Sequence, residues 1–414
     1  MAVSAVLIGA GQRGHYVYGR YGLDHPERLR FVAVIDPDEE RLDRFQAAHP
    51  HAVPFRDVAA WAEDGPNADI AIVASPDRHH HDGVLAALAR RCHVLCEKPM
   101  AATPADTLAV AQAAVEADRL LAVAHVLRYT PFFSSLNAVV RSGRLGRLIT
   151  VEHRENVSAF HMAHSFVRGN WAVAGRSTPM IVQKCCHDFD ILVWNLQDPI
   201  RRLSSFGSLL EFRPEHAPPN ATARCTDPCP VHDCPFDARR YLDQGWPADG
   251  WPLHVLTDDR SDHGRLAALR TGPYGRCVYT AGSDVVDHQV VAMETAAGVS
   301  VSLAMHGHSG EEGRTMRYDG SRATVRARFG RHQEIEVTDH RTGAVEPVPI
   351  EAAAGGHGGG DVGIVSSFLR AVATGTTPLT SAADSVESHV LAFAAEEARV
   401  SGQVIDLARY RSSI

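Results

Sequence analysis

The run Ala5-Val6-Leu7-Ile8-Gly9-Ala10-Gly11-Gln12-Arg13-Gly14, close to the start of the chain, predicts its fold. Four apolar residues form a short strand, and the glycines that follow have the spacing of a turn from a strand into a helix. Such a turn lets backbone N–H groups approach a pyrophosphate at the helix N-terminus. Asp36 ends the next predicted strand, about 20 residues further on, where a carboxylate accepts hydrogen bonds from ribose hydroxyls and repels a 2′-phosphate. We therefore expect NAD, in preference to NADP, to be bound by Gly9, Gly11, Gln12, Arg13, Gly14 and Asp36.

Short strands and helical patterns alternate outward from this turn, which is typical of a parallel sheet covered by helices. The predicted strands are Ala5–Ile8, Phe31–Ile35, Ile70–Ala74, His93–Cys96 and Leu120–His125. The predicted helices between them are Glu39–Ala48, Val84–Arg91 and Pro104–Ala117. We expect residues 1–126 to form an NAD-binding Rossmann domain.

A different pattern begins after Arg128 and predicts an α/β domain, residues 127–414, built on a mainly antiparallel open sheet. Its expected strands are Leu148–Asn156, Arg202–Phe212, Val285–Glu294, Val299–His306 and Ala323–Phe329. Its expected helices are Phe132–Ser142 and Val362–Ala373, the second following a glycine-rich linker. Residues 214–273, rich in Pro, Asp and Cys, read as a long loop insertion.

The composition excludes several classes of protein. The 414 residues carry 41 Lys and Arg against 49 Asp and Glu, a formal net charge of −8, which argues against a nucleic-acid-binding surface. Eight Cys are too few for a secreted disulfide scaffold. The N-terminus has no basic leader and the chain has no long apolar run, so we expect a cytoplasmic protein with no membrane partner and a small-molecule substrate.

A second group of motifs follows two later strands. Ser75-Pro76-Asp77-Arg78-His79-His80 stands at one strand end, and Glu97-Lys98-Pro99 follows the strand His93–Cys96. Ligands of open α/β sheets bind at the carboxyl ends of the strands, so Lys98 is a candidate catalytic residue. On its own, a lysine before a proline is more often a solvated loop residue.

Together with Arg128-Tyr129-Thr130-Pro131, these motifs resemble the glucose-fructose oxidoreductase and inositol dehydrogenase (Gfo/Idh/MocA) family in order and spacing. The resemblance implies a sugar or cyclitol substrate, and a homo-oligomer, a dimer or tetramer, that often forms through the open sheet face. It implies that Lys98 lies beside the nicotinamide and exchanges a proton with the reacting alcohol. It places the further cofactor-binding residues at Ser75, Pro76, His80 and Glu97.

The third motif is Gln183-Lys184-Cys185-Cys186-His187-Asp188-Phe189-Asp190. The resemblance assigns His187 as the active-site histidine, and Asp190, three residues on, shares its helical face and could orient the imidazole or a substrate hydroxyl. Several family members have Asp where this chain has Gln183, which is neutral, so Lys98 and the substrate-binding candidate Lys184 gain importance. Arg128 is placed at the domain junction, either to bind substrate or to lock the domains together. The alternative for the whole motif is a capped helix N-terminus with solvated charges.

Three thiols in the insertion, Cys225, Cys229 and Cys234, form the last candidate site. Their spacing suits a structural zinc ion whose fourth ligand is His232, Cys277, Cys185 or Cys186. Reduced thiols packed against one another explain the same cluster without a metal.

The leading hypothesis is an NAD-dependent oxidoreductase that transfers hydride between the nicotinamide and a secondary hydroxyl of a sugar, sugar derivative or cyclitol. The first alternative is a redox-neutral enzyme that cleaves a glycoside by oxidation and elimination while its NAD stays bound. The second is a non-catalytic module that binds NAD or senses a sugar.

Overall fold

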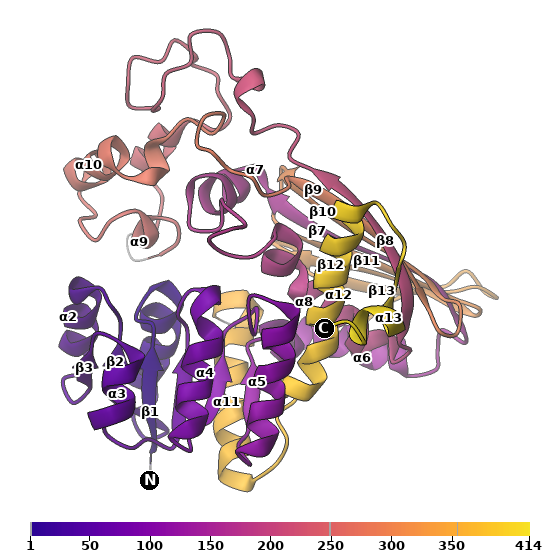
Figure 1. The fold of residues 1–414 in the computed structure, drawn as a ribbon. Helices are drawn as coiled ribbons and strands as arrows, with labels where there is room; N and C mark the ends of the chain where they lie inside the picture. The colour runs from indigo at the N-terminus through magenta and orange to yellow at the C-terminus, as the bar shows by residue number, and fades with distance from the viewer. Residues whose placement is uncertain (1, 248–249, 354) are drawn as a thin grey trace.

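A computed structural model describes residues 2–247, 250–353 and 355–414. The first sheet has six parallel strands in the order β3-β2-β1-β4-β5-β6 (Figure 1). Its strands are β1 Val3–Ile8, β2 Leu29–Ile35, β3 Val53–Phe55, β4 Ile70–Val73, β5 His93–Cys96 and β6 Leu121–Val123. This order reverses between β1 and β4, and the carboxyl ends beside such a reversal are where doubly wound sheets bind dinucleotides.

Helices cover both faces of this sheet because its strands are apolar on both sides. They are η1 Gly14–Gly19, α1 Arg20–Asp24, α2 Glu39–Ala48, α3 Val58–Asp64, η2 Asp77–His79, α4 His80–Ala89 and α5 Pro104–Glu116. The parallel sheet expected from the sequence is confirmed. Helix α11, Gly360–Thr374, also joins this domain, since Ile364 and Phe368 lie in one hydrophobic cluster with Leu7 of β1. The Rossmann core is therefore completed by residues that the sequence analysis assigned to the second domain.

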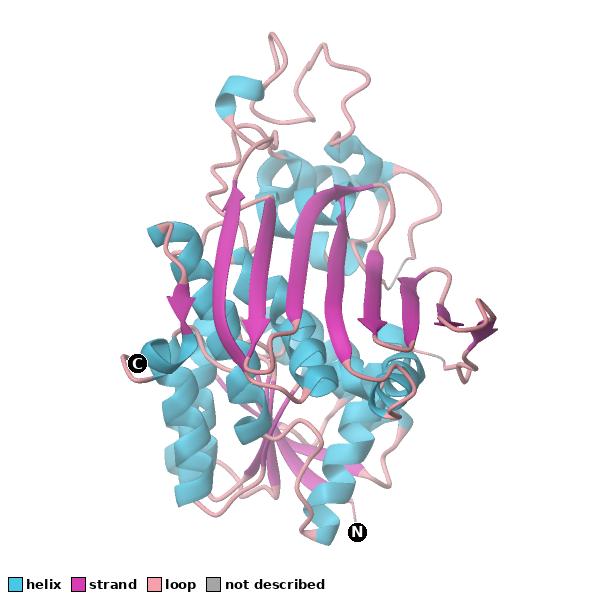
Figure 2. Ribbon diagram, turned by 90° about the vertical axis from the view of Figure 1, so that its right-hand side faces the viewer, coloured by secondary structure: helices cyan, strands magenta, loops and turns pink. Residues whose placement is uncertain are grey.

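The second sheet has nine strands in the order β14-β13-β12-β11-β7-β10-β9-β8-β15, antiparallel except where β10 pairs with β7. Its strands are β7 Leu148–Ser158, β8 Ile200–Ser208, β9 His288–Thr295, β10 Ser300–Ser309, β11 Gly313–Gly320, β12 Ala323–Gly330, β13 Glu334–Asp339, β14 Val345–Pro347 and β15 Ile405–Asp406. One face packs on helices and the other is open, facing the viewer in Figure 2. The mainly antiparallel open sheet is confirmed, with β11, β13, β14 and β15 added to the expected strands.

The remaining helices of this domain cover the closed face or join the two sheets. They are η3 Val126–Tyr129, α6 Pro131–Arg141, α7 Ala159–His161, η4 Met162–Arg168, α8 Met180–Leu196, η8 Gly356–Gly359, α12 Ala382–Ser401 and α13 Leu407–Arg411. Helix α8 is the central one, with most of its residues buried between the sheet and α12. None of the helices in the described part of the chain is long and apolar enough to span a membrane.

The insertion is more ordered than the loop expected from its composition. It contains η5 Pro214–His216, η6 Ala238–Leu242, α9 Leu253–Leu256, α10 Asp262–Thr271 and η7 Pro273–Gly275. A small core of its own includes Tyr241, Leu269 and Tyr274. Ser261 begins α10 by accepting a hydrogen bond from the backbone N–H of Gly264, a capping signal that was available in the sequence.

Candidate active site at the domain junction

The glycine turn after β1 is tightly packed on one side and open on the other. Gly9 has φ +98°, and a Cβ there would lie 2.5 Å from the backbone nitrogen of Ser75. A Cβ on Gly14 would collide with the carbonyl oxygen of Gly9. At Gly11, by contrast, the nearest atom is Nη1 of Arg41 at 3.9 Å. The turn thus requires glycine for packing and leaves Gly11 open to a ligand, which fits a dinucleotide pyrophosphate.

Asp36 is held beside this turn. One carboxylate oxygen accepts a hydrogen bond from the N–H of Ala10 at 2.8 Å, and the other accepts one from the N–H of Asp38 at 3.0 Å. Nη1 of Arg41, on α2, lies 3.7 Å from the same carboxylate. Each carboxylate oxygen has a second lone pair, so Asp36 keeps acceptor capacity for ribose hydroxyls.

Replacing Asp36 with alanine should weaken NAD(H) binding by about 10- to 100-fold, the loss expected for hydrogen bonds to a charged acceptor. NADPH binding should fall less, because the carboxylate that repels a 2′-phosphate is also gone. Fluorescence titration with NADH and NADPH measures both affinities. Asp38→Ala is the matched control, since Asp38 caps α2 through the N–H groups of Glu40 and Arg41. Equal losses for the two cofactors would contradict the assigned role of Asp36.

His80 joins the turns that follow β4 and β5. Its Nε2 lies 2.7 Å from the carbonyl oxygen of Ser75, and its Nδ1 lies 2.7 Å from that of Pro99. The side chain is 1% exposed, which leaves no surface for a cofactor. The prediction that His80 contacts the cofactor stays untested, while its two contacts position the turn at Ser75 and the loop that carries Lys98.

The side chains of Arg13 and Glu97 are bound to each other. Arg13 donates to Glu97 at 2.5 Å and to Asp361, just inside α11, at 2.9 Å, and Tyr18 donates to Glu97 at 2.7 Å. Burial disfavours ionisation of Glu97, but the charge of Arg13 and the hydrogen bonds from Tyr18 and Arg13 hold its pKa below the ordinary value. The expectation that Arg13 and Glu97 contact the cofactor stays a prediction, and in this structure their side chains pair with each other. The ion pair ties the glycine turn to the loop of Lys98.

Lys98 connects the Rossmann domain to α8. It follows β5 through a cis peptide bond to Pro99, and its Nζ donates a 2.8 Å hydrogen bond to the carbonyl oxygen of Gln183. His187 lies one helical turn beyond Gln183. Lys98 and Lys184 are the only two lysines in the chain. This scarcity can be seen in the sequence and draws attention to both positions, but a comparison of motifs does not reveal it.

Two polar groups on α8 are buried without a partner among the described residues, Nδ1 of His187 and Nε2 of Gln183. Burial, followed by the charge of Lys98 and then of His125, lowers the pKa of His187 well below its ordinary value. His187 is therefore a neutral imidazole at pH 7. Buried polar atoms of native proteins nearly always have partners, so these groups are candidates for hydrogen bonds to a ligand.

Comparison with known proteins agrees with this geometry. Residues 3–125 match the model of an oxidoreductase family with an NAD-binding Rossmann fold. Over this first domain the chain is similar to the Gfo/Idh/MocA family. It is 32% identical over 210 residues to an inositol 2-dehydrogenase of Streptomyces avermitilis, an alignment that covers 48% of this chain and 56% of that protein. The chain thus spans little more than half the length of that relative.

Two solved structures share the complete fold. A levoglucosan dehydrogenase in complex with NADH superposes with a TM-score of 0.73 at 16% identity, over 98% of this chain and 99% of that one. An oxidoreductase of Agrobacterium radiobacter, in complex with NAD+, L-tartaric acid and magnesium, gives 0.71 at 17% identity over 99% of each chain. The fold shared with these two structures therefore includes both sheets of this protein.

The second lysine lies in a pocket of carboxylates. Nζ of Lys184 is 3.3 Å from a carboxylate oxygen of Glu155 on β7 and 3.2 Å from one of Glu312. The same oxygen of Glu312 lies 2.9 Å from Nδ1 of His161. Burial disfavours the ammonium ion, but the two carboxylates outweigh burial and raise the pKa of Lys184. The sequence analysis missed Glu155, Glu312 and His161. Glu312 is far from the other two in the chain, and only the fold brings the three residues together near Lys184.

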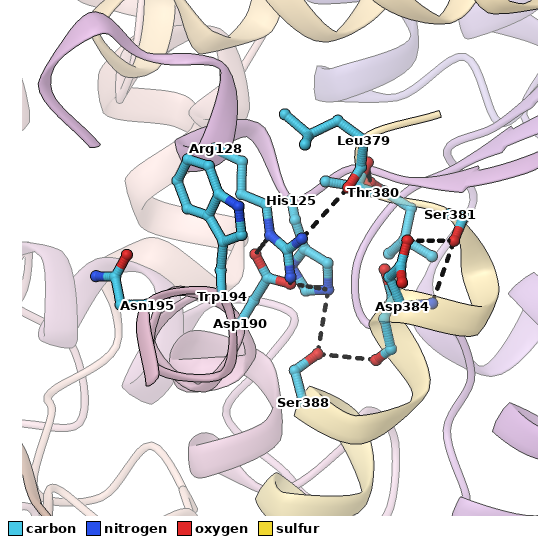
Figure 3. Close-up of polar contacts among 12 residues, drawn as sticks. His125, Arg128, Asp190, Trp194, Asn195, Leu379, Thr380, Ser381, Asp384 and Ser388 are labelled. Atoms are coloured by element: carbon cyan, nitrogen blue, oxygen red, sulfur yellow. Dashed lines mark hydrogen bonds and ion pairs between the residues drawn. The ribbon is translucent and has the colours of Figure 1, made fainter. Parts of the chain in front are cut away.

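Asp190 and Arg128 form a buried ion pair. Nε and Nη2 of Arg128 donate to the two oxygens of Asp190 at 2.7 and 2.6 Å, and Trp194 packs on the guanidinium (Figure 3). The pair is 4% and 1% exposed. The substrate-binding roles expected of both residues, and the orienting of His187 by Asp190, stay predictions. Of the two roles considered for Arg128, its further hydrogen bond to the carbonyl oxygen of Leu379 favours the lock between domains.

The thiols of the insertion lie near one another but do not form a metal site. Cys225, Cys229, Cys234 and Cys277 line one small pocket, and all are free. Across the described ranges, no three His, Cys, Asp or Glu side chains are grouped so as to hold a metal ion. Burial raises the pKa of Cys234, which keeps its thiol protonated. The prediction of a zinc ion is therefore not supported.

Proposed function

We propose that this protein is an NAD-dependent oxidoreductase that transfers hydride between the nicotinamide and a secondary hydroxyl of a sugar, sugar derivative or cyclitol. The observation that carries the proposal is the bond from Lys98 to the carbonyl oxygen of Gln183. It brings the carboxyl end of β5, where the nicotinamide half of a dinucleotide belongs, to the helix that bears His187.

The bound cofactor would supply the hydride chemistry. The residues that fit it are the glycine turn Gly9–Gly14, Asp36 on the ribose hydroxyls, and Ser75, whose hydroxyl is buried without a partner in the described part of the chain. This edge of the sheet combines an open glycine, a fixed carboxylate and a lysine.

Lys98 and His187 divide the handling of the substrate hydroxyl. Nζ of Lys98 exchanges a proton with the hydroxyl oxygen. The hydrogen bond from Nζ to the carbonyl oxygen of Gln183 holds the lysine side chain in place for this role. Neutral His187 accepts or donates one hydrogen bond to the same hydroxyl and so orients it. Gln183 and Lys184 offer an amide and an ammonium to neighbouring substrate oxygens.

Incubation of the purified protein with NAD+ and a panel of inositols, aldoses and glycosides tests the proposal. We expect absorbance of NADH at 340 nm with at least one polyol. Absence of turnover with every member, although NADH binds, would favour the non-catalytic alternative and overturn the proposal.

A redox-neutral glycoside-cleaving reaction is the second candidate. It is favoured by the ion pair between Arg44 of α2 and Asp258 of the insertion, because this contact suits a cofactor that stays bound. Sugar release without net NADH, with solvent deuterium entering the carbon next to the oxidised one, would identify this reaction.

We further propose that copies of the chain associate through the open face of the second sheet. Phe206 of β8 is 72% exposed and is paired with Val290 of β9, which is 45% exposed. Light scattering should find a dimer or tetramer, and Phe206→Asp should shift it toward the monomer.

A further inference from the structure

The insertion reaches across to the Rossmann domain and is bound to it. Nη1 of Arg44, on α2, lies 2.5 Å from Asp258, and Arg260 lies 3.6 Å from the same carboxylate. These three side chains are only partly exposed, with Arg44 at 25% and Arg260 at 19%. In Figure 1, α9 and α10 accordingly stand over α2, above the ends of β2 and β3.

An aromatic contact reinforces this ion pair. The ring of His254, in α9, lies 4.6 Å from the ring of Tyr16, and Arg44 lies over the same tyrosine at 5.9 Å. Nη2 of Arg260 donates to the hydroxyl of Tyr16 at 3.3 Å. The insertion thus holds both helices, η1 and α2, that flank the first turn of the Rossmann fold. We call His254, Asp258 and Arg260 the clasp.

The clasp lies beside the adenosine end of the cofactor site. Tyr16 comes two residues after Gly14, the last glycine of the turn. Arg41, one helical turn before Arg44, is the residue whose guanidinium lies beside both Gly11 and Asp36. In a fold of this order, the pyrophosphate lies over the turn and the adenosine ribose over the residue at the end of β2. The clasp therefore contacts the two helices next to the place where that half of the dinucleotide would bind.

We propose that the clasp closes the adenosine half of the cofactor site and slows release of the dinucleotide, so that one NAD is retained over many encounters with substrate. The inference rests on the proposed NAD-dependent function and adds to it a residue set outside the Rossmann domain. Retention matters most for a redox-neutral reaction, in which the cofactor is restored in each cycle. In an enzyme that instead releases NADH in every turnover, opening of the clasp would limit the rate of that release.

The test is the rate of NADH release, which does not depend on turnover. Protein loaded with NADH is mixed with excess NAD+, and loss of NADH fluorescence is followed. Asp258→Ala and Arg260→Ala should each release NADH about two- to fivefold faster, the range expected for partly exposed polar pairs. The double variant should release it about tenfold faster if the contacts are independent. Higher salt should accelerate release from the wild-type protein, because the Arg44–Asp258 pair is screened.

A double-mutant cycle separates the clasp from direct contact of Arg44 with the cofactor. Arg44→Ala should accelerate release in the wild-type background and change little in the Asp258→Ala background, because the contact is already absent. Asp243→Ala, an exposed position of the same insertion, is the matched control and should not change the rate. Asp258→Asn and circular dichroism show whether a variant keeps the fold.

The outcomes for the clasp and for the proposed function are distinguishable. Unchanged release from folded Asp258→Ala and Arg260→Ala proteins that bind NADH would overturn the clasp and leave the proposed function intact. Failure of the wild-type protein to bind NADH would overturn both.

Discussion

Replacement of Lys98 by alanine should lower kcat by about 10³-fold, within the range that a positioned proton-transfer group contributes. The substitution removes the side chain proposed to exchange a proton with the substrate, and with it the bond to the Gln183 carbonyl. NADH binding should change little, since the glycine turn and Asp36 remain. Kinetics with an active polyol and NADH titration measure the two effects separately.

The scarcity of lysine makes a direct control available. Lys98 and Lys184 are the only lysines in the chain, so reductive methylation with a ¹³C label gives a nuclear magnetic resonance signal from each of them and from the N-terminus. The signal that disappears in Lys98→Ala should be the one that shifts when NAD+ and substrate are added. Full activity of Lys98→Ala, or a Lys98 signal that does not respond to either ligand, would contradict its catalytic role.

Replacement of Arg128 by alanine should lower the free energy of unfolding by about 3–5 kcal/mol, because it leaves Asp190 as a buried charge without its partner. Burial raises the pKa of Asp190, and the charge of Arg128 is the largest opposing effect. Urea unfolding followed by fluorescence measures the loss. The position of α8 should loosen with it, so kcat should fall although neither residue contacts substrate.

Two variants make this prediction specific. Arg128→Met combined with Asp190→Leu should recover much of the stability, since no lone charge remains buried. Arg213→Ala breaks a surface pair with Glu215, whose side chains are about half exposed, and should cost no more than about 1 kcal/mol. A loss at Arg128 as small as that at Arg213 would contradict the lock between domains.

Local patterns predicted the first domain well. The apolar run before Gly9 and the later strands alternate with helices that begin at recognisable caps, so β1, α2 and α5 lie within a few residues of their expected positions. The insertion, predicted as residues 214–273, lies between the end of β8 at Ser208 and the start of β9 at His288, and its order was underestimated. Short helices such as α10 depend on a few capping contacts and on a core too small to produce a strong periodic pattern.

The candidate site was only partly predictable. Lys98 and His187 were proposed because their motifs resemble those of a known family, and their roles stay predictions. The partners of Asp190, Arg13 and Lys184 were not, because each is paired with a charge from a distant segment. A sequence shows that such charges exist but not which of them are buried together, and burial decides the pairing.

The sequence by itself determined the glycine turn and the acidic residue at the end of β2, since these follow from backbone geometry and side-chain type over short spans, and family resemblance added two candidates for handling the proton. Only the tertiary structure decided that α11 completes the first core, that Arg128 pairs with Asp190 on α8, and that the insertion contacts α2. Arg128 and Asp190 are 62 positions apart in the chain, and Arg44 and Asp258 are 214 positions apart. The energies of these contacts depend on which side chains are buried together, and only the folded chain determines which side chains those are.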